Sequence, residues 1–415
     1  MKTLVVGGGG REHALALALS RDPQVAQVYA APGNPGMAGC AALHTVNPMD
    51  SAAVAALAEK LAVDLVVVGP EAPLVAGVAD AVRERGIACF GPSAAAATLE
   101  GSKAFAKDVM AAAGVPTAQA RVCTHPDEVE AALDTFGAPY VVKDDGLAAG
   151  KGVVVTDDRA EAVRHAHRCT RVLVEEYLDG PEVSLFAITD GRTVRPLQPA
   201  QDFKRALDGD AGPNTGGMGA YTPLPWAPAD LVDEVTRTVL QPTVDEMAAR
   251  GTPFAGLLYA GLALTSRGVR VVEFNARFGD PETQPLMALL TSPLGVVLKA
   301  AAEGRLDELD PLTWHDGAAV SVVVAAEGYP EAPHTGDRIE GLEDAERVEG
   351  VHVIHAGTTL DGAGHLVTSG GRVLAVTAVG SDVADARSRA YAGVAEVRIR
   401  GSHHRTDIAA LEGQA

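Results

Sequence analysis

Two polar side chains near the end of a β-branched run have the types and spacing of a cation site. Glu273 and Asn275 stand two residues apart, which predicts that both point to one face of a strand. A carboxylate beside an amide oxygen suits a hard cation such as Mg²⁺. Arg277, a further two residues on, would point to the same face, and Asp280 and Glu282 follow in a Gly/Pro turn. An acidic strand end with a structural salt bridge is the alternative for the Glu-x-Asn pair alone, but the whole string favours a functional site.

A glycine-rich segment between two predicted strands, 139–143 and 153–155, has the composition of a lid over phosphates. Backbone N–H groups and lysine ammonium groups of such a hairpin can bind phosphate oxygens. Lys143, at the end of the first strand, is placed to reach an α- or β-phosphate. The glycine spacing and the flanking strands exclude a Walker A loop. The candidate nucleotide ligands in the segment are Asp145, Gly146, Gly150, Lys151 and Gly152.

The predicted strand at 171–176 enters a turn, and a strand edge of this kind offers backbone groups to an adenine ring. Glu182, just after the turn, is well placed for ribose hydroxyls. Read alone, the segment is an ordinary strand–turn–strand. The candidates for nucleotide contact are Glu175, Glu176, Tyr177, Leu178 and Glu182.

Short apolar strands alternate with helices over the first hundred residues, which predicts a parallel, doubly wound sheet. The expected strands are 4–6, 25–31, 64–68 and 87–90, and the expected helices are 12–20, 51–61 and 75–85. Ligands of such sheets bind beyond the carboxyl ends of the strands, where this chain carries a glycine run and Glu71. Glu12 occupies the place of the third fingerprint glycine, and no acidic residue ends the second strand, so we exclude a dinucleotide site. The run can still bind one phosphate, through Gly8, Gly9, Gly10 and Arg11, although Arg11 and the nearby His13 are equally compatible with a surface or core position.

Composition narrows the possible partners. A chain of 415 residues exceeds one hydrophobic core, and its net charge of −20 argues against nonspecific binding of nucleic acid or anionic membranes. No apolar run is long enough to span a bilayer. The four cysteines are widely scattered without a Cys-x-x-Cys pair, which indicates neither zinc nor a disulfide framework. A reducing cytoplasm is therefore the expected location.

Strings along nearly the whole chain resemble the phosphoribosylamine–glycine ligases of the ATP-grasp superfamily. They are Gly10–Ala14, Ala31–Asn34, Val68–Leu74, Leu99–Lys103, Asp145–Gly152, Gly212–Tyr221, Leu258–Gly261 and Arg277–Gln284. Two places depart from the family pattern: Asp144 stands where a small apolar residue is expected, and the stretch 159–171 is several residues short. Both departures concern the lid.

The resemblance implies the reaction of ATP, glycine and 5-phosphoribosylamine to ADP, phosphate and glycinamide ribonucleotide, a step of purine biosynthesis with glycyl phosphate as intermediate. It implies Mg²⁺, with Mn²⁺ as a plausible substitute, held by Glu273 and Asn275. Lys103, Lys143 and Lys151 would steady the nucleotide. Two other interpretations stay open: a related purine-pathway ligase that activates another carboxylate, and a nucleotide-sensing module that binds ATP without turnover.

By the same resemblance, Arg277 orients the carboxylate or the acyl phosphate, and with Asp280 and Lys143 it forms the catalytic set. Asp280 and Glu71 are candidates for the amine nitrogens. The polar loop at 201–221 would line the substrate pocket. Its candidates are Asp202, Lys204, Asn214, Thr215 and Gly216.

The expected architecture is α/β of the ATP-grasp type. It comprises a doubly wound substrate-binding domain at 1–100, a helical connection at 101–118, a lid at 119–184, an α+β core with the metal and substrate loops at 185–312 and a C-terminal α/β domain at 313–415. In the last domain strands are expected at 319–325, 351–356, 366–368 and 372–378, and a helix at 382–397. His403, His404 and Arg405 are expected to be surface residues. The chain is expected to be a monomer that binds small molecules only.

Overall fold

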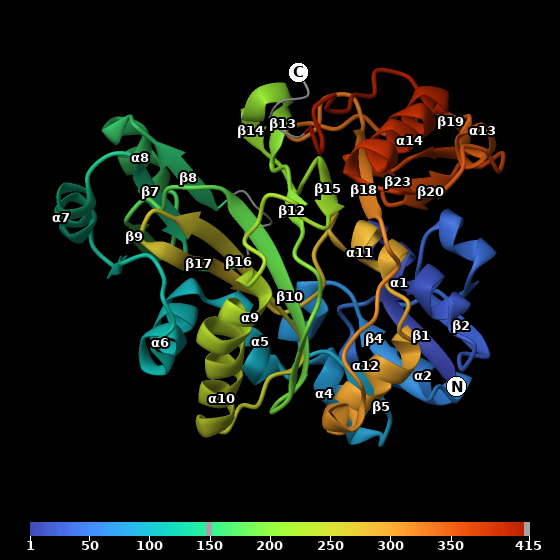
Figure 1. The fold of residues 1–415 in the computed structure, drawn as a ribbon, viewed down its shortest axis with the longest axis horizontal. Helices are drawn as coiled ribbons and strands as arrows, with labels where there is room; N and C mark the ends of the chain where they lie inside the picture. Colours follow the sequence, from blue (N-terminus) through green and yellow to red (C-terminus); the bar gives the residue numbers. More distant parts are fainter. Residues whose placement is uncertain (147–151, 411–415) are drawn as a thin grey trace.

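The computed structural model describes residues 1–146 and 152–410, and its elements form four principal sheets (Figure 1). The first sheet is parallel, with strand order β3-β2-β1-β4-β5. The order reverses between β1 and β4, which makes this a doubly wound sheet as predicted. Its elements are β1 (Lys2–Gly7), α1 (Gly10–Arg21), β2 (Gln27–Pro32), β3 (Ala42–Leu43), α2 (Ser51–Leu61), β4 (Leu65–Val68), α3 (Glu71–Val75), α4 (Val78–Glu84) and β5 (Ala88–Phe90).

Successive apolar side chains of β1 point to opposite faces of this sheet, and both faces are buried. Leu4 and Val6 pack in a cluster with α2 and α4, whereas Val5 packs toward the middle of the molecule. The helix expected at 75–85 is present as α4, which begins only at Val78 because the chain breaks between α3 and α4. Gly77 adopts a left-handed conformation there, with φ 86°, which glycine tolerates without a steric cost.

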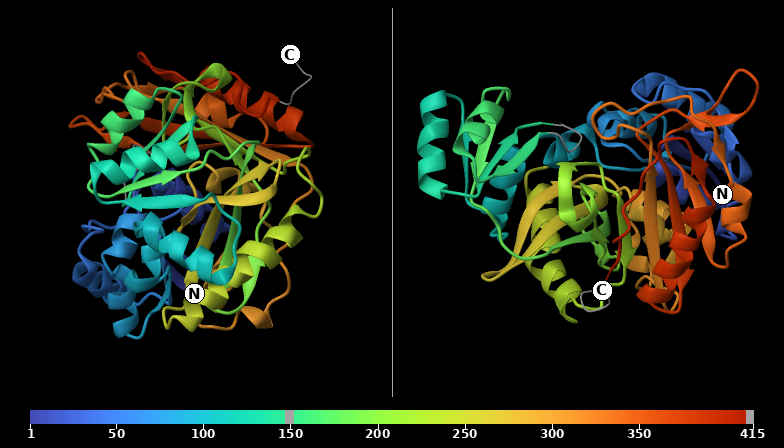
Figure 2. Two further views of the ribbon diagram at one scale, coloured as in Figure 1. Left: turned by 90° about the vertical axis from the view of Figure 1, so that its left-hand side faces the viewer. Right: turned by 90° about the horizontal axis from the view of Figure 1, so that it is seen from above.

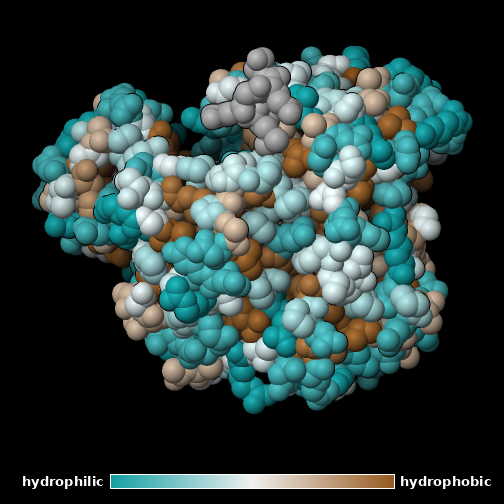
Figure 3. Space-filling model, in the orientation of Figure 1, coloured by the Kyte–Doolittle hydropathy of each residue, from teal (hydrophilic) through white to brown (hydrophobic). Residues whose placement is uncertain are grey.

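The lid is a small antiparallel sheet, β6-β9-β7-β8, covered by two helices. Figure 2 shows this part as a lobe that projects from one end of the molecule. Figure 3 shows a recess between that lobe and the main body, and small apolar groups scattered among hydrophilic side chains. The elements of the lid are β6 (Ala120–Cys123), α7 (Pro126–Phe136), β7 (Tyr140–Asp144), β8 (Val153–Thr156), α8 (Arg159–Ala166) and β9 (Val172–Glu175).

The central sheet is antiparallel, β11-β10-β16-β17, and includes the 11-residue strand β16. Helices α5 and α6 lead along the chain from the first sheet to the lid and contact β17 on the way, and α9 and α10 cover the central sheet (Figure 1). Its elements are α5 (Ala94–Gly101), α6 (Lys103–Ala113), β10 (Glu182–Asp190), β11 (Val194–Pro196), α9 (Leu231–Val235), α10 (Gln241–Ala249), β16 (Ala255–Thr265), β17 (Gly268–Asn275), α11 (Thr283–Leu289) and α12 (Leu294–Ala302).

The fourth sheet, β12-β15-β18-β23-β20, joins two distant parts of the chain. Its first two strands come from the segment expected to be one polar loop at 201–221, which instead forms four short strands. These are β12 (Gln201–Asp202), β13 (Arg205–Leu207), β14 (Ala211–Asn214) and β15 (Gly219–Thr222). The remaining elements are β18 (Ala318–Ala325), β19 (Ile339–Glu340), α13 (Leu342–Glu346), β20 (Val351–His355), β21 (Thr358–Leu360), β22 (Leu366–Thr368), β23 (Arg372–Gly380), α14 (Val383–Glu396) and β24 (Arg398–Ile399).

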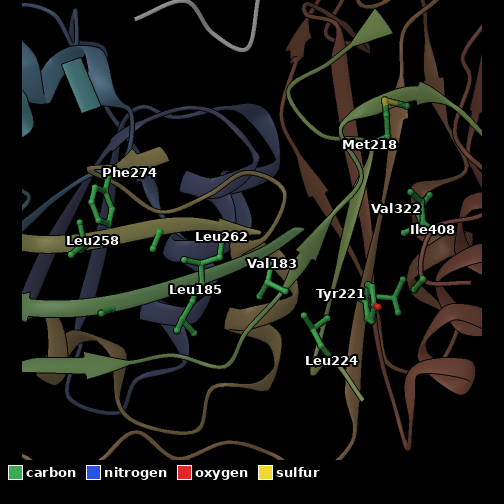
Figure 4. Close-up of a cluster of buried hydrophobic side chains, with 14 of the residues drawn as sticks. Val183, Leu185, Met218, Tyr221, Leu224, Leu258, Leu262, Phe274, Val322 and Ile408 are labelled. Carbon is green, nitrogen blue, oxygen red and sulfur yellow. The ribbon is translucent and has the colours of Figure 1, made fainter. Parts of the chain in front are cut away.

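One hydrophobic cluster connects the central and fourth sheets (Figure 4). Leu185 and Leu262 lie on the central sheet, Tyr221 and Val322 lie on the fourth, and Met218 immediately precedes β15. Burial of such side chains stabilises by about 1.5–3 kcal/mol each, so the two sheets are held together as one body. No helix within the described ranges combines the length and apolar character that a bilayer crossing requires.

Candidate ligase site

A β-bulge in the central sheet aims the predicted cation ligands. Gly261 pairs with Glu273 and the next residue of β16, Leu262, pairs with Val271, so Val272 is an extra residue in β17. Bulges of this kind re-aim the side chains that follow them. Phe274 is 3% exposed and anchors the strand end in the core. Glu273 is half-buried beside it, and Asn275 is 8% exposed.

Arg277 lies at the centre of a buried charge cluster. Its guanidinium contacts the Glu71 carboxylate at 3.2 Å, the Glu100 carboxylate at 3.0 Å and Asn275 Oδ1 at 3.2 Å. Burial opposes ionisation of Arg277, but the charges of Glu100 and Glu71 outweigh it and raise the arginine pKa. The same cluster lowers the pKa of Glu71, because the attraction of Arg277 and Arg11 exceeds the effect of burial.

Glu100 is a site residue that sequence reasoning missed. One of its carboxylate oxygens accepts the Ala276 N–H at 2.6 Å while the other contacts Arg277. Burial raises its pKa, and Arg277 offsets this only in part. It lies in the last turn of the alanine-rich helix α5, where its neighbours give no chemical signal. The string Leu99–Lys103, which resembles the family, was the only available indication.

Asp280 is held from two sides. Gln284 Nε2 donates to its Oδ1 at 2.8 Å, and Arg372 at the start of β23 contacts its Oδ2 at 3.1 Å. Arg372 also donates to the backbone carbonyl of Asp280 at 2.7 Å. Burial alone would raise the pKa of Asp280, but Arg372 and Arg11 lower it below the ordinary value. Arg372 is a second residue that sequence reasoning missed.

The glycine run lies against this cluster, and Glu12 fills the space beyond the strand ends. The Gly9 N–H donates to Glu12 Oε2 at 2.7 Å, and Arg11 Nε contacts Glu12 Oε1 at 2.6 Å. A Cβ at Gly69 would approach Glu12 Oε1 to 2.1 Å. The buried carboxylate therefore occupies the region where a dinucleotide fingerprint would leave room for a pyrophosphate.

The remaining N-terminal candidates face the same cluster from α1. A Cβ at Gly10 would lie 3.4 Å from Asp280 Oδ1, and Arg11 also donates to the Phe278 carbonyl at 3.0 Å. Gly8 meets the Gly33 carbonyl, at 2.5 Å from an added Cβ. His13 points away from this cluster and accepts the His355 N–H at 2.8 Å. It therefore connects α1 to β20 of the fourth sheet and does not belong to the site.

On the nucleotide side, Lys143 belongs to a buried ion cluster. Its ammonium contacts Glu175 at 2.8 Å and donates to the bulge carbonyl of Val272 at 3.3 Å. Lys107, which sequence reasoning did not select, contacts the other Glu175 oxygen at 3.1 Å. Burial lowers the pKa of Lys107, whereas for Lys143 the attraction of Glu175 and Glu273 exceeds burial and raises its pKa. The Glu175 side chain is thus bound to two lysines.

Asp145 connects the lid to the start of α6. Its carboxylate accepts Ser102 Oγ at 3.1 Å and the Ala104 N–H at 3.2 Å, and Lys103 donates to the Gly146 carbonyl at 2.9 Å. Gly152 immediately precedes β8, and its carbonyl accepts the Asp144 N–H at 2.8 Å. Gly150 and Lys151 lie outside the described residues.

In the segment after β9, where adenine was predicted to bind, some backbone and side-chain groups already have partners in the protein. Glu176 pairs with Arg267 at 3.1 Å and accepts the Gln119 N–H at 3.0 Å. Tyr177 is 47% exposed, and Leu178 is half-buried.

Lys204 joins the predicted ribose ligand to the predicted substrate loop. Its ammonium donates to Glu182 and contacts Asp202 at 3.4 Å. Burial raises the pKa of Asp202 to about 7; Lys204 opposes this rise, and the nearby Glu282 adds to it. Thr215 Oγ1 donates to the Lys204 carbonyl at 2.8 Å.

The other two loop candidates lie at the edge of this group. Gly216 is exposed, and its N–H donates to the Tyr329 hydroxyl at 3.0 Å. Asn214 is exposed and pairs with Arg205 in the β13–β14 hairpin.

The expectation that Arg405 is a surface residue is wrong. Its side chain is 2% exposed, contacts Asp407 at 2.6 Å and Asp210 at 2.7 Å, and lies 5.0 Å from the Phe203 ring centroid. Phe203 stands between Asp202 and Lys204, so a residue near the end of the chain supports the substrate loop.

The donor set at the end of β17 fits a divalent cation. Within the described residues the Glu273 carboxylate makes no hydrogen bond or ion pair, and Asn275 Oδ1 accepts one bond only. Both oxygens therefore retain lone pairs for a hard cation. No group of three or more histidine, cysteine or acidic side chains with metal-binding geometry occurs in the part of the chain that the structure describes. Phosphate and water oxygens would have to complete the coordination.

The antiparallel lid with its buried Lys143, and the central sheet with the carboxylate–amide pair at the end of β17, define an ATP-grasp enzyme. The biotin carboxylase domain of the Hydrogenobacter thermophilus 2-oxoglutarate carboxylase, solved with MgADP and bicarbonate, shares the fold: the TM-score is 0.74 at 18% identity, over 97% of this chain and 91% of that one. Family models for the N, ATP-grasp and C domains of phosphoribosylglycinamide synthetase match residues 1–100, 101–283 and 319–411.

Whole-length relatives narrow the class further. A phosphoribosylamine–glycine ligase of Streptomyces coelicolor is 68% identical over 99% of both chains, and one of Mycobacterium leprae is 56% identical over 98% of this chain and 97% of its own. The crystal structure of the Thermotoga maritima enzyme superposes with a TM-score of 0.85 at 32% identity, covering 98% of this chain and all of that one. The chain belongs to the phosphoribosylamine–glycine ligase family, which confirms the resemblance read from its motifs.

Proposed function

We propose that this protein ligates glycine to 5-phosphoribosylamine at the expense of ATP, forming glycinamide ribonucleotide, ADP and phosphate in purine biosynthesis. The observation that carries the proposal is the cluster at the end of β17, where Arg277, Asp280 and Glu71 lie beside the Glu273–Asn275 pair. A nucleotide-sensing module would need no such arrangement of substrate-facing charges next to the cation ligands.

The chemistry explains why the site needs both halves. A carboxylate is a poor electrophile toward an amine, because oxide would have to leave. A glycine carboxylate oxygen therefore attacks the γ-phosphorus, ADP leaves, and glycyl phosphate forms. The amine nitrogen then attacks the acyl carbon, the C–O bond to phosphate breaks, and the nitrogen loses a proton as the amide forms. Holding the two reactants together supplies much of the rate enhancement.

The buried charges suit these steps. Arg277 is a fixed cation that we assign to the carboxylate and then to the acyl phosphate. Its two carboxylate partners leave the cluster negative, and Glu71, whose side chain is 28% exposed, is the partner available to an ammonium group. Asp280 stays ionised because Arg372 and Arg11 lower its pKa, so it can accept a hydrogen bond from an amine. Lys143 is the cation assigned to the phosphates.

For the cation we propose Mg²⁺, with Mn²⁺ as a substitute, because both metals prefer oxygen ligands. When bound, the cation offsets the negative charge of the phosphate groups during transfer. Glu273 and Asn275 would hold it between the lid and the central sheet. The cytoplasmic location and the monomeric state remain predictions; size-exclusion chromatography with light scattering measures the second.

Heavy-oxygen labelling tests the proposed route. Glycine carrying ¹⁸O in its carboxylate should transfer one labelled oxygen to inorganic phosphate when ATP and phosphoribosylamine are present. Hydrolysis of ATP by water would leave the glycine oxygen out of phosphate. A complete reaction that forms product with unlabelled phosphate would contradict the acyl phosphate, and absence of glycine-dependent ADP release would favour a nucleotide-binding module.

A further inference from the structure

Residues at the edge of the fourth sheet bind two segments of the candidate site, the substrate loop at Gly216 and the turn at Asp280. Arg372 Nη1 donates to the carbonyls of Gly216 and Asp280, and its Nη2 contacts Asp280 Oδ2 at 3.1 Å. The Tyr329 hydroxyl accepts the Gly216 N–H at 3.0 Å. Gly216 is therefore held on both sides of its backbone. We call Tyr329, Gly371 and Arg372 the C-terminal clamp.

Close packing makes the clamp one unit. A Cβ at Gly371 would lie 2.2 Å from Tyr329 Cδ2, so only glycine lets the ring lie against this backbone. A Cβ at Gly216 would lie 2.9 Å from Arg372 Cζ. Gly217 has φ 111°, and a Cβ there would lie 2.4 Å from Pro281 Cδ. The substrate loop, the turn after Asp280 and the clamp are therefore closely packed against one another.

We propose that Arg372 and Tyr329 are positioning residues for the amine half of the ligase site, a role that rests on the proposed function. Arg372 sets where the Asp280 carboxylate stands relative to the loop at 215–217. One guanidinium can reach three acceptors in fixed directions, which a lysine ammonium cannot reproduce. The segment 318–410 thereby takes part in substrate recognition, in addition to packing against the central sheet.

The contacts separate this role from nucleotide binding. Within the described residues, Arg372 and Tyr329 make no hydrogen bond or ion pair with the lid or with Lys143. The groups that face Asp280 are Arg372 from β23, Arg11 from α1 and the nearby Arg277. Loss of Arg372 leaves Asp280 with two cations and its Gln284 contact, but without the contact that ties its carboxylate to the loop at 215–217, so binding of the amines should weaken while binding of ATP should not.

Steady-state kinetics of Arg372→Ala and Tyr329→Phe test the inference, with phosphoribosylamine supplied as a mixture of ribose 5-phosphate and ammonia. We expect Arg372→Ala to raise KM for glycine or phosphoribosylamine about tenfold or more, the size of a lost charged hydrogen bond, and to change KM for ATP less than about twofold. Tyr329→Phe keeps the ring and should shift the same KM values in the same direction. Because the residues act as a unit, the double variant should add little to Arg372→Ala.

Arg389→Ala is the matched control, since Arg389 pairs with Asp385 at 2.9 Å on α14, away from the site. It should leave every KM unchanged. Unchanged amine KM values in Arg372→Ala, or an equal rise in KM for ATP, would overturn the inference. If Arg372→Ala fails to fold, Tyr329→Phe decides by the same criterion. A wild-type protein that forms no glycinamide ribonucleotide would instead refute the proposed function.

Discussion

Replacement of Glu175 by glutamine should destabilise the lid far more than replacement of Glu176, its neighbour in the chain. The Glu175 side chain is 3% exposed and contacts both Lys143, which is 5% exposed, and Lys107, which is 14% exposed. Glutamine has the same shape but no charge. The variant would leave two buried ammonium groups without their common counter-ion. Lys143 would retain the more distant Glu273 and Glu182, and Lys107 the more distant Glu176.

The magnitude follows from the burial of the cluster. Removal of one partner from a buried ion pair costs about 3–5 kcal/mol. A stranded lysine can escape by losing its proton, which at pH 7 costs about 5 kcal/mol for an ordinary pKa of about 10.4, so this value limits the penalty for each lysine. We expect a loss of about 3–5 kcal/mol for Glu175→Gln. Glu176 pairs with Arg267, which is 47% exposed, and such surface pairs contribute about 0–1 kcal/mol.

Amide hydrogen exchange measures this difference where it arises. The free energy of opening is read from the amides of β7 and β9, which report the lid separately from the other sheets. Protection of these strands should fall sharply in Glu175→Gln and change little in Glu176→Gln. Equal protection in the two variants would refute the reasoning, because the lysines would then have to be solvated and not held in a low-dielectric cluster.

Three further predictions concern the cation ligands, the buried histidine of α1 and the glycine that packs against Glu12. Glu273→Gln and Asn275→Leu should lose most turnover while ATP still binds weakly; near-normal activity of both at ordinary magnesium concentration would contradict the cation site. The wild-type protein should lose stability as the pH falls from 6.5 toward 3, by about 1.4 kcal/mol per pH unit from His13, because burial lowers its pKa from 6.5 to about 3 and only the unfolded chain takes up the proton in that range. Urea unfolding at several pH values should give a smaller slope for His13→Asn, and an identical slope would remove this histidine as the cause. Gly69→Ala should lower the melting temperature strongly, since its Cβ would meet the buried glutamate of α1 at 2.1 Å, whereas Gly39→Ala, with nothing within 4 Å, should not; similar melting temperatures would show that the glutamate can move.

Local sequence patterns were sufficient to predict most helices and strands and the candidate cation ligands on one strand. The two-residue spacing of Glu273 and Asn275 predicted a shared strand face, and the apolar strands of the first hundred residues predicted a parallel sheet buried on both sides. Both inferences depend on the periodicity of the backbone, which neighbouring residues express directly. The position of Glu12 likewise predicted that the glycine run is no dinucleotide site, and the structure shows its carboxylate filling that space.

Only the tertiary structure decided which charges meet. Glu100 reaches the strand end across 176 residues of sequence, and Arg372 reaches Asp280 across 92. Arg405 was expected to be a surface residue and is instead buried against Phe203 of the substrate loop. A single arginine or glutamate carries no local signal of its partner, because ion pairing depends on distance in space and on burial. Both are settled only when the four sheets pack together.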